Sequence, residues 1–300
     1  DYNGYVADAL PEAVAGVVEI VTPSQFAKLL TDGVPAETKA VIKNNFNFDG
    51  ATLTPVNNFD KFRELELDGD EKVISGINVS TEGTVAALFP QVADAQFSNL
   101  VFEKITVDAG EGEEAYAGAL IGLTYGDVVL DNVKISESVV KGTNKVGGLI
   151  GSVMEDSITA TGCVVTKSTI ETYDVADESG LAGGLIGYIS CQESADTSST
   201  IESCEVTETI ITVINSRDSE ARANSEFIGG VGGDKGDELI INKAKVDKNT
   251  FNETGATTYK KLHDLVGGTR GSFNMNIDGV AYWNGLTYEL PKANAKGVIE

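Results

Sequence analysis

Apolar and polar residues alternate along most of this chain with a period of two, which is the spacing of β-strands. The alternation recurs in six similar blocks, in each of which a small or polar residue precedes an inward apolar position and a second apolar position follows two residues later. These positions are Leu100, Val133, Cys163, Cys204, Ala244 and Val280, followed by Phe102, Ile135, Val165, Val206, Val246 and Tyr282. The pattern predicts six equivalent strands in one register.

A short glycine-rich motif precedes each block. It is nearly identical in KVGGLIG (145–151) and LAGGLIG (181–187), and the same frame accepts TVAALFP (84–90), YAGALIG (116–122), FIGGVGG (227–233) and LVGGTRG (265–271). The unequal intervals between copies indicate a fixed core with insertions at turns. The shortest interval, from residue 116 to 145, is 29 residues, whereas a four-stranded propeller blade needs roughly 40 to 45.

A hexapeptide period, typical of left-handed β-helices, is absent, and parallel crossovers are right-handed as a rule. We therefore predict an all-β, single-stranded right-handed parallel β-helix. The glycines have two candidate uses: positive φ at a corner, or close approach of neighbouring coils. The pairs Leu149-Ile150 and Leu185-Ile186 should then begin a buried strand.

The ends of a solenoid need caps, because an open row of backbone donors and apolar residues promotes association. Thr22 or Ser24 can N-cap a helix beginning at Pro23, and Gly33 suits its C-terminus. We expect one β-helix domain over 1–300. Its parts are an N-terminal segment with a capping helix (1–36), first coils (37–80), the six-copy region (81–282) and a C-terminal cap (283–300).

The glycine motif resembles the GLUG motif of surface proteins from gut Bacteroidales and of some secreted bacterial peptidases and adhesins. The lead-in also resembles that family, in TPSQFAKLLTDG from Thr22, AVIKNNFNFDG from Ala40 and FRELELDGDEKVISGINVS from Phe62. The resemblance covers roughly residues 20 to 290 and implies a secreted, adhesin-like β-helix. FIGGVGG and LVGGTRG depart from the usual G-L-x-G ending, so we expect less regular last coils.

Charge limits the partners. The chain has 22 basic and 46 acidic residues, a net charge of −24, which repels nucleic acids and anionic membranes. No stretch approaches the roughly 18 apolar residues of a membrane helix. The sequence opens at Asp1 without an initiator methionine or a signal sequence. These features favour a processed or trimmed protein at an extracellular or outer-membrane surface, and we expect a monomer.

Nucleophilic chemistry has little support. Cys163, Cys191 and Cys204 lack metal or disulfide spacing, and Cys163 and Cys204 occupy equivalent inward positions, which favours a small buried ladder. Cys191 falls in an insertion, where its thiol could be exposed. His263 is the one histidine, directly before a glycine motif, so any triad would have to use it.

Acidic turns are the candidate metal sites, and calcium is the ion they would suit. Neither cluster has EF-hand spacing, and aspartate beside glycine is ordinary turn chemistry. The clusters are Asp68, Asp70 and Glu71 around Gly69, and Asp234, Asp237 and Glu238 around Gly236; Glu111, Glu113 and Glu114 form an acidic loop with Gly110 and Gly112. We expect no cofactor and treat these groups as turn and surface residues.

Two further sets bear on carbohydrate recognition. Tyr125, Tyr188, Tyr282 and Trp283 would form a stacking platform if they faced outward, although core or capping roles are the simpler interpretation. The basic residues near turns are Lys61, Arg63, Arg222 and Arg270.

The pattern favours a non-catalytic adhesin-like protein that binds glycan or protein ligands through turns and insertions, especially residues 188–200 and 214–226. A polysaccharide lyase or glycoside hydrolase is the alternative, because parallel β-helices host both chemistries and fold alone does not decide function. A structural stalk is the second alternative. No catalytic residue is assigned from sequence.

Overall fold

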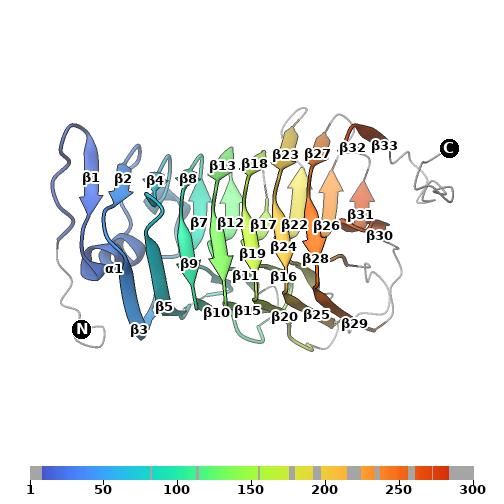
Figure 1. Cartoon of the computed structure of the whole chain (residues 1–300), viewed down its shortest axis with the longest axis horizontal. Coiled ribbons are helices and arrows are strands. Elements are labelled where there is room, and N and C mark those ends of the chain that lie inside the picture. The colour runs from blue at the N-terminus through green and yellow to red at the C-terminus, as the bar shows by residue number, and fades with distance from the viewer. Residues whose placement is uncertain are drawn as a thin grey trace.

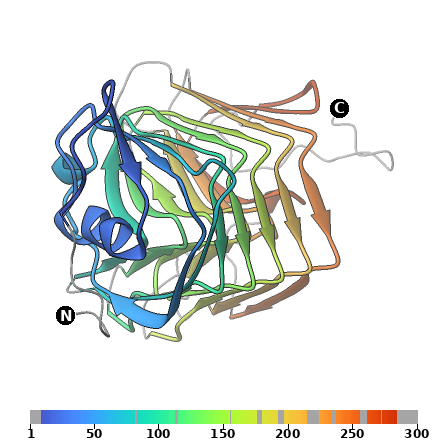
Figure 2. The ribbon, with the colours of Figure 1, turned by 60° about the vertical axis from the view of Figure 1, so that its left-hand side comes forward.

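The computed structural model describes residues 9–283 except positions 82, 113–114, 155, 176–179, 192–196, 215–223, 234–236, 256–260 and 272. Its strands stack as a parallel β-helix, running from the N-terminal end to the C-terminal end along one axis (Figure 1). Successive coils stack directly on one another along this axis (Figure 2). The predicted fold class is confirmed, and a propeller is excluded because neighbouring strands are parallel.

Four sheets run along the solenoid. Sheet 1 contains, in order, β1 (Val17–Ile20), β2 (Lys39–Ile42), β4 (Glu66–Asp68), β8 (Gln96–Ser98), β13 (Val128–Asp131), β18 (Ile158–Thr161), β23 (Ser198–Glu202), β27 (Glu238–Asn242), β32 (Asn274–Ile277) and β33 (Val280–Trp283). Sheet 2 contains β28 (Lys245–Asp247), β24 (Glu205–Thr207), β19 (Val164–Thr166), β14 (Lys134–Ser136), β9 (Val101–Glu103), β5 (Val73–Val79), β10 (Thr106–Asp108), β15 (Val139–Gly142), β20 (Thr169–Thr172), β25 (Ile210–Ile214) and β29 (Thr250–Thr254), with β3 (Phe46–Leu53) beside β5.

The glycine motifs build the other two sheets. Sheet 3 contains β21 (Leu181–Gly183), β16 (Lys145–Gly147), β11 (Tyr116–Gly118) and β6 (Val85–Ala86). Sheet 4 contains β30 (Lys261–His263), β31 (Val266–Gly271), β26 (Ile228–Gly233), β22 (Ile186–Cys191), β17 (Ile150–Val153), β12 (Ile121–Tyr125) and β7 (Phe89–Ala93). A regular coil therefore has five short strands, for example β13 to β17. As predicted, β17 and β22 begin at the buried residues Ile150 and Ile186.

The interior consists of ladders of like residues. Phe102, Ile135, Val165 and Val206 are Cα partners in successive coils, and each is fully buried. Val246 continues this ladder in the next coil. The predicted register is thus confirmed over five blocks. Burial of one face forces this register, because a slip of one residue would expose every apolar side chain.

The sixth block departs from the prediction. Val280 and Tyr282 do not continue the parallel ladder; β33 turns back and pairs antiparallel with β32, so that Val280 lies opposite Ile277 and Tyr282 opposite Met275. An antiparallel strand has the same apolar and polar alternation as a parallel one. The sequence pattern therefore could not distinguish the two directions.

Two motif copies also pair differently from the predicted frame. Ile228 lies opposite Ile186, so FIGGVGG matches LIGYISC (185–191), four residues beyond the predicted alignment. In the first copy, Phe89 pairs with Ile121 as expected, but Val85 instead of Thr84 lies opposite Tyr116. Sheet 3 accordingly ends at β21, and the side chain of Asn224 accepts a hydrogen bond from the Ala182 amide at 2.8 Å. The last coils are less regular, as the sequence indicated.

Close approach, rather than positive φ, explains the glycines of the motif. None of Gly118, Gly147, Gly151, Gly183 or Gly187 has a positive φ. A Cβ atom at Gly147 would collide with the Ile150 carbonyl of its own corner and lie 2.7 Å from the Gly187 nitrogen of the next coil. Sheets 3 and 4 thus meet at a corner so tight that only a hydrogen atom fits.

Left-handed residues are found at another corner. Between sheets 1 and 2, Asn99, Asn132 and Ser203 have φ values of 51°, 52° and 54°. Asparagine tolerates this conformation because its short polar side chain can form local hydrogen bonds. The side-chain Nδ2 of Asn132 donates to Asn99 Oδ1 at 3.0 Å, and Nδ2 of Asn99 donates to Asp68 Oδ1 at 3.1 Å.

The predicted capping helix is present as α1 (Pro23–Asp32). Thr22 is its N-cap and forms a capping box with Gln25, while Gly33, with φ of 73°, ends the helix. Phe26 packs against Phe46, Phe48 and Phe102 with ring centroids 6.2 to 6.3 Å apart. The helix therefore closes the N-terminal end of the core (Figure 2).

At the other end, an antiparallel strand pairs with the last parallel strand of two sheets: β33 with β32 in sheet 1, and β30 with β31 in sheet 4. The predicted cap at 283–300 lies outside the described residues apart from Trp283.

Cys163 and Cys204 form the predicted buried ladder. Both are free thiols and fully buried, and the Cys163 amide donates to Cys204 Sγ at 3.4 Å. The hydrogen bond with Cys204 and burial raise the pKa of the Cys163 thiol. Cys191 ends β22, opposite Gly233.

We predict that Gly147→Ala lowers the free energy of unfolding by about 2 kcal/mol or more, because the added methyl group meets backbone on two sides. Denaturant unfolding followed by circular dichroism measures this. Gly112→Ala is the matched control, since a Cβ there meets nothing within 4 Å. Equal stability of the two variants would contradict the close-packed corner.

We further predict that Cys163 and Cys204 remain thiols that do not react with a thiol reagent in the folded protein, since buried thiols are inert. A Cys191→Ser variant leaves these two as the remaining cysteines. It should show no reactive thiol under native conditions and both in denaturant. A native signal from either cysteine, or a missing signal after unfolding, would refute the buried dithiol.

Candidate functional site

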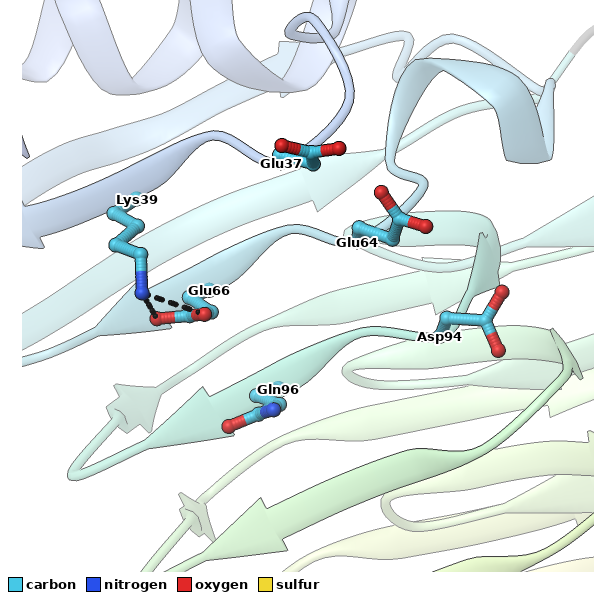
Figure 3. A pocket seen from close by; sticks show the side chains of 6 residues that line it. All are labelled: Glu37, Lys39, Glu64, Glu66, Asp94 and Gln96. Atoms are coloured by element: carbon cyan, nitrogen blue, oxygen red, sulfur yellow. Dashed lines mark hydrogen bonds and ion pairs between the residues drawn. The ribbon is translucent and has the colours of Figure 1, made fainter. Parts of the chain in front are cut away.

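The outward face of sheet 1 near the N-terminal end carries a depression of about 480 Å³. It is lined by Glu37, Lys39, Glu64, Glu66, Asp94 and Gln96. Figure 3 shows these side chains in two columns that cross three successive coils, Glu37, Glu64 and Asp94 in one and Lys39, Glu66 and Gln96 in the other. Each of the three coils contributes one residue to each column.

Strand alternation places these side chains on the surface. In 64–68 and 94–98, polar residues alternate with Leu65, Leu67, Ala95 and Phe97, whose exposure is at most 1%. Because the apolar residues must face the core, their polar neighbours face solvent. Glu66 lies opposite both Lys39 and Gln96, so parallel pairing aligns the column.

Electrostatics differ between the two columns. Lys39 Nζ contacts both carboxylate oxygens of Glu66, at 2.8 and 2.7 Å. Glu37, Glu64 and Asp94 lie at the turns that lead into the strands. Their φ values are left-handed, at 61°, 53° and 51°. This turn column is exposed and acidic. Because these carboxylates stay in contact with solvent in the folded protein, their oxygens are available to accept hydrogen bonds from a ligand.

An aromatic pair adjoins the turn column. Phe59, in the 3₁₀ turn η1 (Phe59–Lys61), packs on Tyr125 at the end of β12, with ring centroids 5.3 Å apart. Arg63 lies over the Phe59 ring at 5.2 Å, and its guanidinium reaches Asp94 at 3.5 Å and Asp60 at 3.3 Å. Arg63 thus connects the aromatic pair to the acidic rim of the depression.

A second depression of about 460 Å³ continues from the first across sheet 1. It shares Lys39, Glu66 and Gln96 with the first and extends to Asp131 on β13. The remaining lining residues are Val17, Ala40, Val41, Leu67, Asp68, Phe97, Ser98 and Val129. We call the two depressions together the sheet 1 trough. Its floor is the outer face of β1, β2, β4, β8 and β13.

The predicted acidic cluster around Gly69 forms a turn. Asp68 Oδ1 accepts hydrogen bonds from the Asp70 amide at 2.9 Å and from Asn99 at 3.1 Å, and Asp70 and Glu71 adopt left-handed turn conformations. Asp68 also lines the trough. Glu111 is exposed in its loop; Glu113, Glu114, Asp234 and Gly236 lie outside the described residues.

Asp237 has a structural role. It is 2% exposed, and its Oδ1 accepts from the Thr197 amide at 3.2 Å and from the Thr197 hydroxyl at 3.0 Å. Glu238 begins β27. In the part of the chain that the structure describes, no group of three or more His, Cys, Asp or Glu residues is arranged to hold a metal ion.

His263 lies in β30, and its Nδ1 accepts a hydrogen bond from the Leu265 amide at 3.1 Å. Tyr188 is 8% exposed, and Lys145 lies over its ring and that of Tyr116 at 4.8 and 4.9 Å. Of the four predicted aromatic candidates, Tyr125 is linked to the rim of the trough through Phe59, Arg63 and Asp94. Tyr282 and Trp283 belong to β33, where the structure describes the backbone alone.

The basic candidates are dispersed. Arg63 is part of the site. The Lys61 carbonyl instead accepts a hydrogen bond from the backbone amide of Val34, just after the capping helix. Arg270 is part of β31, opposite Gly232. Arg222 lies outside the described residues, as do 192–196 and 215–223 of the two predicted binding segments, 188–200 and 214–226.

Sequence reasoning did not identify Glu37, Lys39, Glu64, Glu66, Asp94, Gln96 or Phe59. A signal for most of them existed: RELELDG (63–69) and DAQFSN (94–99) share the same alternation. Aligning these two segments would have stacked Glu66 on Gln96 and Asp68 on Ser98, as the structure does.

No protein-family model and no curated protein matches the chain. A solved structure does share the fold: a protein of Bacteroides ovatus described as a "putative immunoglobulin A1 protease". The TM-score is 0.50 with 14% sequence identity, over 89% of this chain and 79% of that protein. At this identity the similarity supports the fold class, a β-solenoid related in structure to a Bacteroides protein. The GLUG resemblance itself stays a prediction.

Among the described residues, no helix is long and apolar enough to cross a membrane.

Proposed function

We propose that this chain is a non-catalytic, adhesin-like binding protein of an extracellular or outer-membrane surface, and that its ligand is a glycan held in the sheet 1 trough. The observation that carries the proposal is the trough itself, a depression lined by carboxylate, amide and lysine side chains. The Phe59–Tyr125 pair is connected to its rim through Arg63, which lies over Phe59 and pairs with Asp94. Sugars present hydroxyl donors and apolar ring faces, which this combination of acceptors and aromatic rings suits.

The surroundings of the polar residues support binding rather than turnover. Glu66 is held by Lys39, and Asp94 by Arg63, so both carboxylates are engaged as charged partners. His263 accepts a backbone hydrogen bond in a hairpin of sheet 4. Cys163 and Cys204 are buried in the core. Glu66, Asp94 and His263 thus have structural partners, and the two cysteines are out of reach of a ligand.

The enzyme class of the Bacteroides ovatus protein is not carried over to this chain, because 14% identity supports shared fold and not shared chemistry. A polysaccharide lyase or hydrolase remains the alternative, since Glu64, Glu66 and Asp94 all line one depression. Incubation with plant, fungal and host polysaccharides and with immunoglobulin A1 separates the classes. Accumulation of cleaved product by the purified chain would overturn the non-catalytic proposal.

We predict that Glu66→Gln weakens binding to glycans retained on a glycan array by about tenfold, because a charged acceptor forms a hydrogen bond of about 1.5–3 kcal/mol. Glu205→Gln is the matched control. Glu205 also forms a cross-strand pair with a lysine, Lys245, at 3.1 Å, but on sheet 2. Calorimetric titration should show unchanged affinity for this control. Equal loss in both variants, or in neither, would contradict binding in the trough.

A further inference from the structure

The trough has a direction, which follows from the register of sheet 1. Lys39, Glu66, Gln96 and Val129 are successive Cα partners on β2, β4, β8 and β13. Another column, distinct from the turn column, lies two residues further along the same four strands and contains Val41, Asp68, Ser98 and Asp131. Both columns run along the solenoid axis, across the strands. Outward side chains therefore recur at the interstrand spacing of about 4.8 Å, although their chemistry differs from coil to coil.

The two overlapping depressions follow the same direction. Together they extend from Val17 on β1 to Asp131 on β13, with Lys39, Glu66 and Gln96 common to both. Five neighbouring strands span about 19 Å at the usual spacing. A ligand that fills the trough must therefore be extended along the solenoid axis.

We propose that the trough binds an extended, uncharged polysaccharide whose chain runs along the solenoid axis from β1 to β13, with one coil contacting each successive part of the polymer. This inference rests on the proposed function and specifies its ligand class. Uncharged chains are favoured because Glu37, Glu64, Asp94 and Asp131 are exposed there and the whole chain carries a net charge of −24. Acidic glycans would be repelled.

An extended peptide fits this surface less well than a glycan. Peptides that bind sheets add to an exposed edge, where backbone groups are free. The trough lies on the face of the sheet, and β2, β4, β8 and β13 each pair with a strand on both sides. A ligand on this face can therefore bind to side chains and not to the paired backbone. Most of the polar side chains there can accept hydrogen bonds from hydroxyl groups. Val129, 36% exposed, adds an apolar contact for a sugar ring.

The length dependence of binding tests the inference. The probes are disaccharides, tetrasaccharides and hexasaccharides of mannan, xyloglucan and mixed-linkage β-glucan, with oligogalacturonides of the same lengths as the acidic comparison. Titration calorimetry with the whole chain should show affinity for the best neutral series that increases at least about tenfold from disaccharide to hexasaccharide. Oligogalacturonides should bind more weakly at every length.

Variants at the two ends of the trough sharpen the test. Lys39→Gln on β2 and Asp131→Asn on β13 lie three strand spacings apart, about 14 Å. Both should weaken hexasaccharide binding about threefold to tenfold, whereas a disaccharide is affected by one of them at most. Unchanged unfolding midpoints show that both variants fold.

Each remaining outcome counts against a distinct claim. Equal affinity for all lengths, with Asp131→Asn without effect on any of them, would overturn the axial polymer while leaving glycan binding intact. Tighter binding of oligogalacturonides would overturn the uncharged class. Retention of extended peptides but of no glycan at any length would overturn the proposed function and this inference together.

Discussion

The rest of the structure depends on in-register hydrogen bonding between parallel strands of successive coils. Because each coil lies directly on the previous one, a residue facing inward in one coil is followed by an inward residue in the next, as Phe102, Ile135, Val165 and Val206 show. The same constraint acts on the outside. Lys39, Glu66 and Gln96 form a column for the same reason that the core forms a ladder.

The tight corner between sheets 3 and 4 limits how this register can be achieved. Glycine is required there because the corner places its backbone against the carbonyl of its own turn and the amide of the next coil. Where the glycine pattern weakens, sheet 3 ends, and Asn224 replaces strand pairing with a side-chain hydrogen bond. Insertions are tolerated at other turns because the cost of closing a loop rises only slowly with its length, and the strands on either side stay in the ladder.

Features that packing determines could be predicted from sequence, and features that it leaves free could not. Burial requires apolar residues at every second position, so the core ladder and the stacked cysteines were predictable. LAGGLIG contains two similar segments four residues apart, LAG (181–183) and LIG (185–187). The FIG of FIGGVGG fits either one, and apolar content alone does not distinguish them, which explains the error of four residues. Val280 is ambiguous in the same way, because reversal of strand direction preserves the alternation. The trough residues were missed because outward positions accept any polar side chain.

This freedom of the outer face allows a common solenoid to carry different surfaces. The stack constrains inward residues and corner glycines, and at 14% identity the Bacteroides ovatus protein shares the fold with few of the same residues. Outer columns such as Glu37, Glu64 and Asp94 can change without disturbing the ladder, which is why the proposed function is assigned to them. The repeat nevertheless constrains the ligand, since any column it builds is linear and periodic. A long polymer with regularly spaced hydroxyl groups matches that geometry better than a compact molecule does.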